Sequence, residues 1–303
     1  MSVALKSGAA LGAGLVVVYT AMISSADAIT KLIAGVYAAP QLYALSALIV
    51  LGLSVLADRH RSQRRGLATG CPRAMALRSV ATVVAAVAFF NAFRALPFAQ
   101  VFLFIGLMPI LAGLMSGPIL GEHVSASAWA ALAAGFIGVV CLFPGGVGSV
   151  TTGHLWALLA AVSGTFSMVL ARFIGRIETN ALAQVFYPNL AILVAMSVAL
   201  PFVWRPMPPA DLGWVAGYAI CLFAARWLSV VALRLLAAFA VTPLMNLQFV
   251  WMVAIGALAF GEIPAAGTWL GVAIVIGSGL FLVWDQFAPQ GSTRTGLRLR
   301  TDP

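Results

Sequence analysis

The sequence repeats a pattern of rare residues at a spacing of 140 positions (121 to 261), and this repeat constrains the fold more than any other feature. Three matches share the offset: Gly121-Glu122 with Gly261-Glu262, Trp129 with Trp269, and Arg94 with Arg234. Charged residues make up only 8% of the 303 residues, and the chain has only 8 tryptophans. A fixed offset among such rare residues indicates a duplicated structural unit.

The apolar runs are long enough to cross a membrane. The chain is 62% hydrophobic with a mean hydropathy of +1.05, and several runs exceed the roughly 18 apolar residues that mark a transmembrane helix. The pattern predicts an all-α integral membrane protein with ten transmembrane helices. Their expected ranges are 11–33, 40–57, 78–96, 98–119, 126–144, 154–174, 182–203, 213–234, 240–260 and 266–284.

Each copy of the repeat is expected to hold five helices. Because five is odd, the second copy must cross the membrane in the opposite direction, so the two copies form an inverted repeat. Such folds enclose a site near the middle of the bilayer and open it to alternate sides by rocking one copy against the other. The sequence therefore predicts a first five-helix unit at 1–145, a second at 153–286, and a disordered cytoplasmic tail at 287–303.

The basic residues predict the orientation of the chain. With the N-terminus in the cytoplasm, most of the 17 basic residues fall in cytoplasmic segments, as the positive-inside rule requires. These residues are Lys6, Arg59, Arg61, Arg64, Arg65, Arg73, Arg78, Arg172, Arg176, Arg234, Arg294, Arg298 and Arg300. Both termini are then cytoplasmic, and the expected location is a bacterial inner membrane. The net charge of +9 does not indicate a nucleic-acid partner, because the charges lie in loops.

Arg226 is the first candidate for substrate binding. It lies about 13 residues into the expected helix 213–234, roughly 20 Å from the outer end of that helix. An arginine at this depth costs about 2.5–3.5 kcal/mol on insertion scales, so it is expected to face a cavity or a partner. Because no acid lies at its depth, its planar fork of donors suits a substrate carboxylate. The alternative is an arginine bonded to backbone carbonyls and to the amides of Asn246 or Gln248.

Asp27 has two interpretations. It lies four residues before Lys31, so the two side chains share a helix face, and an ion pair near the outer interface is the simpler account. The second account is a coupling residue: a carboxylate in a dry cavity that takes up a proton during transport.

Uncharged polar and aromatic residues within the apolar runs are candidates for the lining of a cavity. The substrate-binding candidates beside Arg226 are Asn91, Asn246, Gln248, Tyr187, Trp227 and Phe90. The alternatives are hydrogen bonds between helices for the amides and a lipid-facing position for the aromatic rings.

Several charged residues and prolines lie where helices end or bend. Arg94 and Arg234 end two helices at opposite faces, where each either guards a gate or bonds the last carbonyls of its own helix. Glu122 and Glu262 lie at tight turns and are expected to cap the free amides of the following helix. Pro109 and Pro188 each remove a backbone donor within a helix, and the expected result is a kink in the helices 98–119 and 182–203. The alternative is that the membrane setting tolerates both prolines without a kink.

The sequence contains no arrangement typical of catalysis. The histidines, at positions 60, 123 and 154, fall at loops or helix ends, and no Ser/His or paired-Asp group lies at membrane depth. No phosphate-binding glycine loop precedes a lysine, and the cysteines are far apart without metal-ligand spacing. We therefore expect no enzymatic activity, cofactor or metal. A channel or lipid scramblase is a further alternative, against which an inverted repeat favours a carrier.

Ten helices in two halves, with a Gly-Glu pair after the fourth and ninth, resemble the EamA-type branch of the drug/metabolite transporter superfamily. The resemblance covers about residues 8–286. It implies a central cavity lined by the first, third, fourth, sixth, eighth and ninth helices, and many similar members export amino acids. The first helix lacks the tryptophan that relatives often carry there, although Tyr19 is nearby.

The expected function is therefore secondary transport of small polar metabolites. The first hypothesis is amino-acid export by alternating access, and the second is uptake of a vitamin or nucleotide-like metabolite. The expected partners are the small-molecule substrate and the lipid bilayer, and the carrier is expected to act as a monomer.

Overall fold

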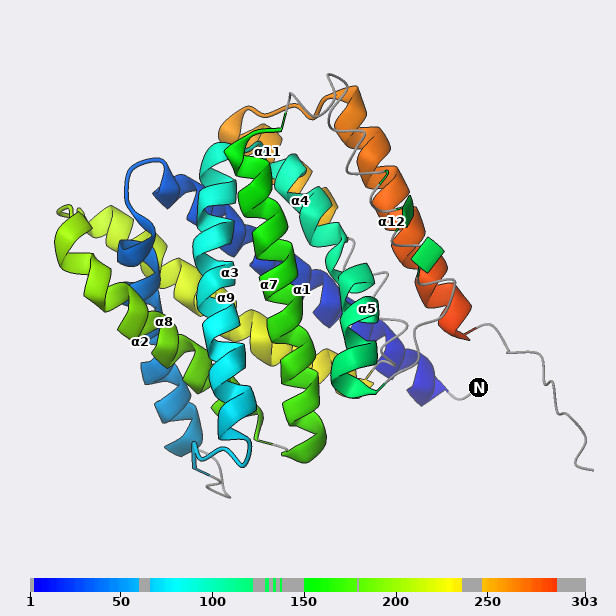
Figure 1. Cartoon of the computed structure of the whole chain (residues 1–303), viewed down its shortest axis with the longest axis horizontal. Helices are drawn as coiled ribbons and strands as arrows, with labels where there is room; N and C mark the ends of the chain where they lie inside the picture. The colour runs from blue at the N-terminus through cyan, green and yellow to red at the C-terminus, as the bar shows by residue number, and fades with distance from the viewer. Residues whose placement is uncertain are drawn as a thin grey trace, which may run out of the picture.

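The computed structural model describes residues 3–59, 66–121, 129–130, 133–134, 137, 150–178, 180–235 and 247–287. These residues form helices and connections without any strand. The helices are α1 (Val3–Ala34), α2 (Ala39–Arg59), α3 (Pro72–Ala95), α4 (Phe98–Gly106), α5 (Met108–Leu120), α7 (Thr152–Ile177), α8 (Ala181–Val203), α9 (Pro209–Leu235), α11 (Leu247–Phe260) and α12 (Ala266–Phe287) (Figure 1).

Six helical stretches among the described residues are long and apolar enough to cross a membrane, which confirms the prediction of an α-helical membrane protein. They are Gly14–Ala34, Ala39–Arg59, Pro72–Ala95, Phe98–Leu120, Thr152–Ile177 and Leu182–Val203. Two shorter apolar helices cover Pro209–Ala225 and Gln248–Phe260. The expected helix 126–144 lies almost wholly outside the described residues, as do Glu122, Asn246, most of the arginine-rich loop and the tail after residue 287.

Prolines account for the main differences between expected and observed helix bounds. The third and eighth expected helices begin earlier in the structure, with Pro72 and Pro209 as their first residues. Proline suits the first turn because its missing N–H would have no intrahelical partner there. The expected helix 98–119 is interrupted at Leu107, and Pro109 lies in the first turn of α5. This break agrees with the kink predicted at Pro109. At Pro188, where the same prediction applies, α8 continues as one helix.

Contacts between connecting segments define two ends of the bundle. At the Lys31 end, the Lys31 ammonium binds Leu96, which follows α3, and Glu262, which follows α11. At the Glu178 end, Glu178 follows α7 and binds the segment before α3. Gly121 ends α5 at the Glu178 end, where Arg176 binds the carbonyl of Leu120 at 3.0 Å. Helices joined by a short described connection, such as α3 and α4 or α8 and α9, therefore run in opposite directions.

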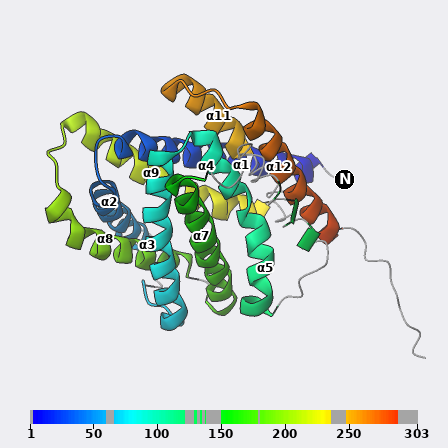
Figure 2. The same cartoon turned by 45° about the horizontal axis from the view of Figure 1, so that its top comes forward.

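Three helix pairs form most of the packing. α3 packs along α7, α1 along α9, and α2 against α8 (Figures 1 and 2). One buried cluster joins the end of α3, α4, α7 and α11, with Phe98 and Leu103 fully buried in it. A second joins α1, α2, α8 and α9 around Leu42 and Tyr43. The first cluster includes the contact between α4 and α11.

Candidate functional site

A row of polar side chains follows one face of α1. Thr20, Ser24, Asp27 and Lys31 are spaced by four, three and four residues, which places them on the same side of the helix. This row faces α11 and the turn after it, through the partners Gln248, Trp251 and Glu262. We call these seven residues the α1–α11 polar seam. Polar contacts of this density between two apolar helices join them by specific bonds in addition to packing.

The middle of the seam is a carboxylate bound by an amide. Gln248 Nε2 donates to Asp27 Oδ2 at 3.2 Å, and the backbone carbonyl of Gln248 accepts a bond from Ser24 Oγ at 3.3 Å. One turn away, Trp251 Nε1 donates to Thr20 Oγ1 at 3.2 Å. Gln248 is buried and Asp27 is partly exposed. The Asp27 carboxylate forms no ion pair with any described basic side chain.

The Lys31 end of the seam is an ion pair that also binds backbone. Lys31 Nζ lies 2.7 Å from Glu262 Oε1 and donates to the carbonyl of Leu96 at 2.7 Å. Glu262 Oε2 accepts a bond from the amide of Phe98 at 2.7 Å. The ammonium also lies 5.5 Å from the centre of the Phe260 ring. We call this group the Lys31–Glu262 cluster.

The cluster changes two expectations about these charges. Lys31 pairs with Glu262 and not with Asp27, its neighbour on the same helix face. Glu262 caps the first turn of α4 rather than the helix that follows it, because the residue before α4 is Pro97, which has no side-chain acceptor.

Of the other predicted site residues, Gln248 belongs to the seam, whereas Asn91, Phe90 and Tyr187 make contacts outside it. Gln248 joins Asp27, as above, but Asn91 donates to the carbonyl of Val87 in its own helix at 2.8 Å. Phe90 is fully buried with its ring edge-on to Tyr43, at 5.9 Å between centres. Tyr187 is partly exposed and packs against the neighbouring ring of Phe186.

For four predicted residues, the structure describes no side chain. Arg226, Trp227 and Arg234 belong to α9, and their side chains lie outside the described part of the structure. Asn246 lies outside it entirely.

Arg94 lines a pocket at the Lys31 end. The pocket has a volume of about 380 Å³ and lies between the α1–α2 connection, the end of α3 and the α8–α9 connection. We call it the Arg94 pocket. Beside it, Tyr37 donates its hydroxyl proton to Asp211 Oδ2 at 2.5 Å. This bond, which needs the neutral hydroxyl, raises the pKa of Tyr37, and both burial and the neighbouring negative charge act in the same direction.

The buried side-chain amides of Gln41 and Asn180 each bind a connection in the other half of the chain. At the Lys31 end, Gln41 donates to the carbonyl of Arg205 at 2.7 Å and accepts from its amide at 3.2 Å. At the Glu178 end, Asn180 donates to the carbonyls of Gly66 and Ala68 at 2.8 and 3.3 Å. We call these the two amide latches. Gln41 and Asn180 lie at the starts of α2 and α8, one residue from the 140-residue offset.

The sequence contains a signal for part of the site. The spacing of Thr20, Ser24, Asp27 and Lys31 marks a continuous polar face in an apolar helix. Their partners Trp251 and Glu262 and the latch residue Gln41 had no such signal, because each is a single polar group in or after an apolar run.

Comparison with known proteins establishes the fold but no family. No family model matches the chain, and no curated protein matches it. A solved structure described only as "Crystal structure of protein" superposes with a TM-score of 0.63 at 18% sequence identity. The match covers 93% of this chain and 99% of that one, so the chain shares its fold with that protein over nearly its whole length.

Proposed function

We propose that this protein is a secondary transporter built from ten transmembrane helices in two inverted five-helix repeats. The observation that carries the proposal is that the largest contacts between helices are matched in pairs when the two halves are exchanged. Under the 140-residue offset, α1 exchanges with α7, α2 with α8, and α3 with α9. The contact of α3 with α7 then becomes that of α9 with α1, and the contact of α3 with α8 becomes that of α9 with α2. The contact of α2 with α8 maps onto itself.

The matching features lie at opposite ends of the bundle, which supports inversion of one half. Gly121 and Gly261 both have positive φ, at 69° and 66°, and both end a helix. Gly121 lies at the Glu178 end, whereas Gly261 precedes Glu262 at the Lys31 end. The amide latches are likewise divided between the ends. A twofold axis in the plane of the membrane accounts for all of these pairs.

The polar seam is present in one half only, and this asymmetry supports a role in function. The counterpart of the seam is the contact of α7 with α5, where Gly164 packs against Met108, as Ser24 packs against Gln248. At the offset positions, six of the seven seam residues differ: Thr20 is replaced by Ala160, Ser24 by Gly164, Asp27 by Ser167, Lys31 by Ala171, Gln248 by Met108 and Trp251 by Leu111. The seventh, Glu262, corresponds to Glu122, which lies outside the described residues. The counterpart packs without the charges of Asp27 and Lys31, so the contact between the corresponding helices does not require them.

The proposed location is a bacterial inner membrane with both termini in the cytoplasm. Among the described residues, Arg59, Arg73, Arg78 and Arg176 lie near the Glu178 end. By the positive-inside rule the Glu178 end then faces the cytoplasm, and the Lys31 end faces outward. The same topology is found in the EamA-type transporters that the sequence resembles.

The proposed mechanism is alternating access along the polar seam. The Lys31–Glu262 cluster closes the outer end in the conformation described here, and rocking of the two halves opens it. Asp27 is the proton-coupling residue, because its carboxylate is bound by the Gln248 amide and by no described cation. Arg226 binds the carboxylate of the substrate, with amino-acid export as the first assignment. Uptake of a vitamin or nucleotide-like metabolite is the second.

Counterflow in proteoliposomes tests the proposal. Vesicles loaded with one unlabelled amino acid at a time are diluted into the labelled compound, and a carrier shows faster entry of label when the inside is loaded. The Arg226→Ala variant should lose this exchange for carboxylated compounds, while Arg73→Ala, an exposed arginine at the Glu178 end, should retain it. Flux that internal substrate never accelerates would indicate a pore and would refute the carrier.

A further inference from the structure

The Arg94 pocket carries two guanidinium groups from different parts of the chain. Arg94 ends α3, and Arg205 lies in the connection between α8 and α9. Both side chains are exposed, and neither forms an ion pair with a described residue. One nitrogen of Arg205 donates to the carbonyl of Val36 at 3.1 Å, which holds that guanidinium at the pocket wall.

The only acid described beside the pocket is already engaged. The Asp211 carboxylate accepts the proton of the Tyr37 hydroxyl, and the lining residues include no aspartate or glutamate. The pocket therefore presents positive charge to a space of about 380 Å³. A group that fills it favourably bears negative charge and several acceptor oxygens, as a phosphate or carboxylate does.

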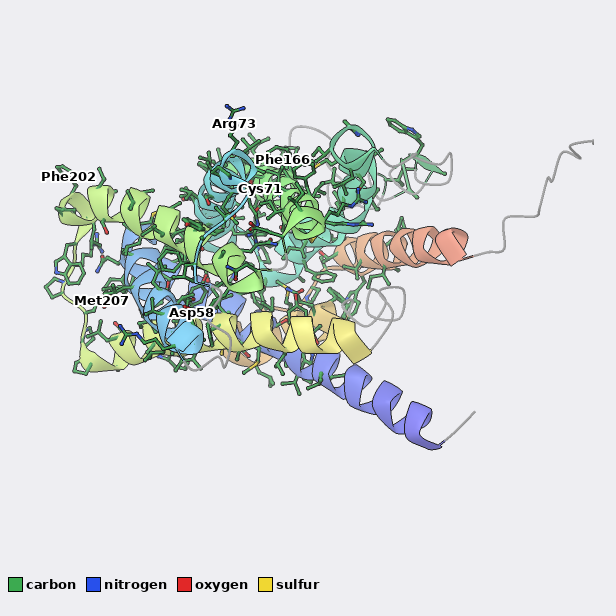
Figure 3. All side chains as sticks on the ribbon, turned by 90° about the horizontal axis from the view of Figure 1, so that it is seen from below. Asp58, Cys71, Arg73, Phe166, Phe202 and Met207 are labelled. Carbon is green, nitrogen blue, oxygen red and sulfur yellow. The ribbon has the colours of Figure 1, made fainter. Side chains whose placement is uncertain are left out.

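An apolar strip of α8 leads away from the pocket. Val194, Val198 and Phe202 are 60%, 70% and 86% exposed, and their spacing of four residues places them on one face. Phe202 lies at the edge of the molecule (Figure 3). The half-exposed Trp204 follows it in the chain and lines the pocket. α8 is long and apolar enough to cross a membrane, and an exposed apolar strip on such a helix is of the kind that faces lipid chains. A lipid whose chain lies there has its headgroup at the level of the two arginines.

We propose that the Arg94 pocket binds the headgroup of an anionic phospholipid. Arg94 and Arg205 bind the phosphate oxygens, Trp204 lies at the level of the glycerol backbone, and the acyl chain follows the strip formed by Val194, Val198 and Phe202. Charge complementarity selects an anionic lipid over a zwitterionic one, because a zwitterion brings its own cation to compete with the arginines. The site is independent of the transport proposal, since it needs only the membrane position of α8.

Native mass spectrometry of the purified full-length protein in a neutral detergent tests this site. The probes are phosphatidylglycerol and phosphatidylcholine with identical acyl chains. We expect preferential retention of phosphatidylglycerol, and roughly fivefold weaker binding for each arginine removed. Arg94→Gln is the deciding variant, because Arg205→Gln also removes the bond to Val36. Arg94→Lys should retain most of the binding, and Arg73→Gln, which removes an arginine far from the pocket, should retain all of it.

Two further measurements locate the lipid and identify its source. Phosphatidylglycerol brominated near the headgroup should quench tryptophan fluorescence in the wild-type protein, and Trp204→Phe should reduce the quenching. Glycerol 3-phosphate and inorganic phosphate, added in the millimolar range, should not displace the lipid. Equal retention of the two lipids, full retention by Arg94→Gln, or displacement by these soluble anions would each overturn the proposal.

Discussion

Lys31 and Glu262 form an ion pair, with 2.7 Å between Nζ and Oε1, that connects α1 to the turn between α11 and α12. The side chains are 14% and 26% exposed. The same two groups bind the connection between α3 and α4 through the carbonyl of Leu96 and the amide of Phe98. Two side chains thus join three segments that are distant in sequence at one end of the bundle.

Removal of both charges of this pair should destabilise the protein by less than the sum of the two single removals. Glu262→Gln keeps an acceptor for Phe98 but leaves Lys31 unpaired, and we expect a loss of about 1–3 kcal/mol in the free energy of unfolding. Lys31→Met should cost a similar amount. The double variant should lose less than the sum, because the two residues share one interaction. Equilibrium unfolding in mixed micelles measures this cycle, and strictly additive losses would contradict the coupling.

The partner of Lys31 illustrates what local spacing can and cannot predict. Residues four apart on a helix share a face, so Asp27 and Lys31 were expected to pair. In the structure, Lys31 reaches past the end of its helix to Glu262, and Asp27 binds Gln248. The sequence determines which face is polar, but the choice between partners depends on the position of α11. That position follows from packing between distant segments, which one sequence does not contain.

The glycines of the repeat were more predictable. Each Gly-Glu pair follows an apolar run, which predicts the end of a helix there. Gly121 and Gly261 do end helices, with backbone φ angles in the left-handed region. A turn that ends a helix this way depends on a local backbone requirement, so it is visible in the residue type. In contrast, Gln41 is a polar residue at the start of an apolar run, and its role in a latch follows only from the tertiary contact with Arg205.

Alanine at either helix-ending glycine should destabilise the protein through the backbone alone. No atom lies within 4 Å of an added Cβ at Gly121 or Gly261, but both have positive φ. We expect Gly121→Ala and Gly261→Ala each to cost about 1–2 kcal/mol, and asparagine to cost less. Gly213→Ala is the matched control, because it has equal space and no positive φ. A thermal melt in detergent measures all of these variants, and equal midpoints for Gly213→Ala and Gly261→Ala would count against this account.

Alanine at Gly153 should destabilise the protein for a different reason. An added Cβ would lie 2.8 Å from Leu96 Cγ and 2.9 Å from Ala95 Cβ, so α7 and the end of α3 would have to separate. Overpacking of this kind costs about 1–3 kcal/mol. Gly277→Ala, in α12 with no atom within 4 Å, should be neutral or slightly stabilising. The same melting experiment compares them, and a neutral Gly153→Ala would show that this contact relaxes freely.

The two amide latches should each contribute to stability, independently of one another. Gln41→Ala leaves the backbone of Arg205 without two bonds, and Asn180→Ala leaves the carbonyls of Gly66 and Ala68 without theirs. Loss of buried hydrogen bonds predicts about 1–3 kcal/mol for each variant. Because the latches lie at opposite ends of the bundle, the double variant should lose the sum of the two. A loss at one end only, measured by unfolding in mixed micelles, would argue against the equivalence of the halves.

Asp27→Asn separates the two functions that the Asp27 carboxylate can have. Asparagine keeps an oxygen for the Gln248 amide, so the contact between α1 and α11 is retained while the titratable charge is removed. If Asp27 carries the coupled proton, the variant still exchanges substrate across the membrane, since exchange needs no net proton movement. It should lose the dependence of net flux on pH. Flux of labelled substrate in vesicles at two pH values, with and without a pH gradient, distinguishes these steps. Gln248→Ala is the companion variant, because it removes the hydrogen bond and keeps the acid. Net flux by Asp27→Asn that still follows the pH gradient as the wild type does would exclude Asp27 as the proton carrier and leave it a structural partner of Gln248.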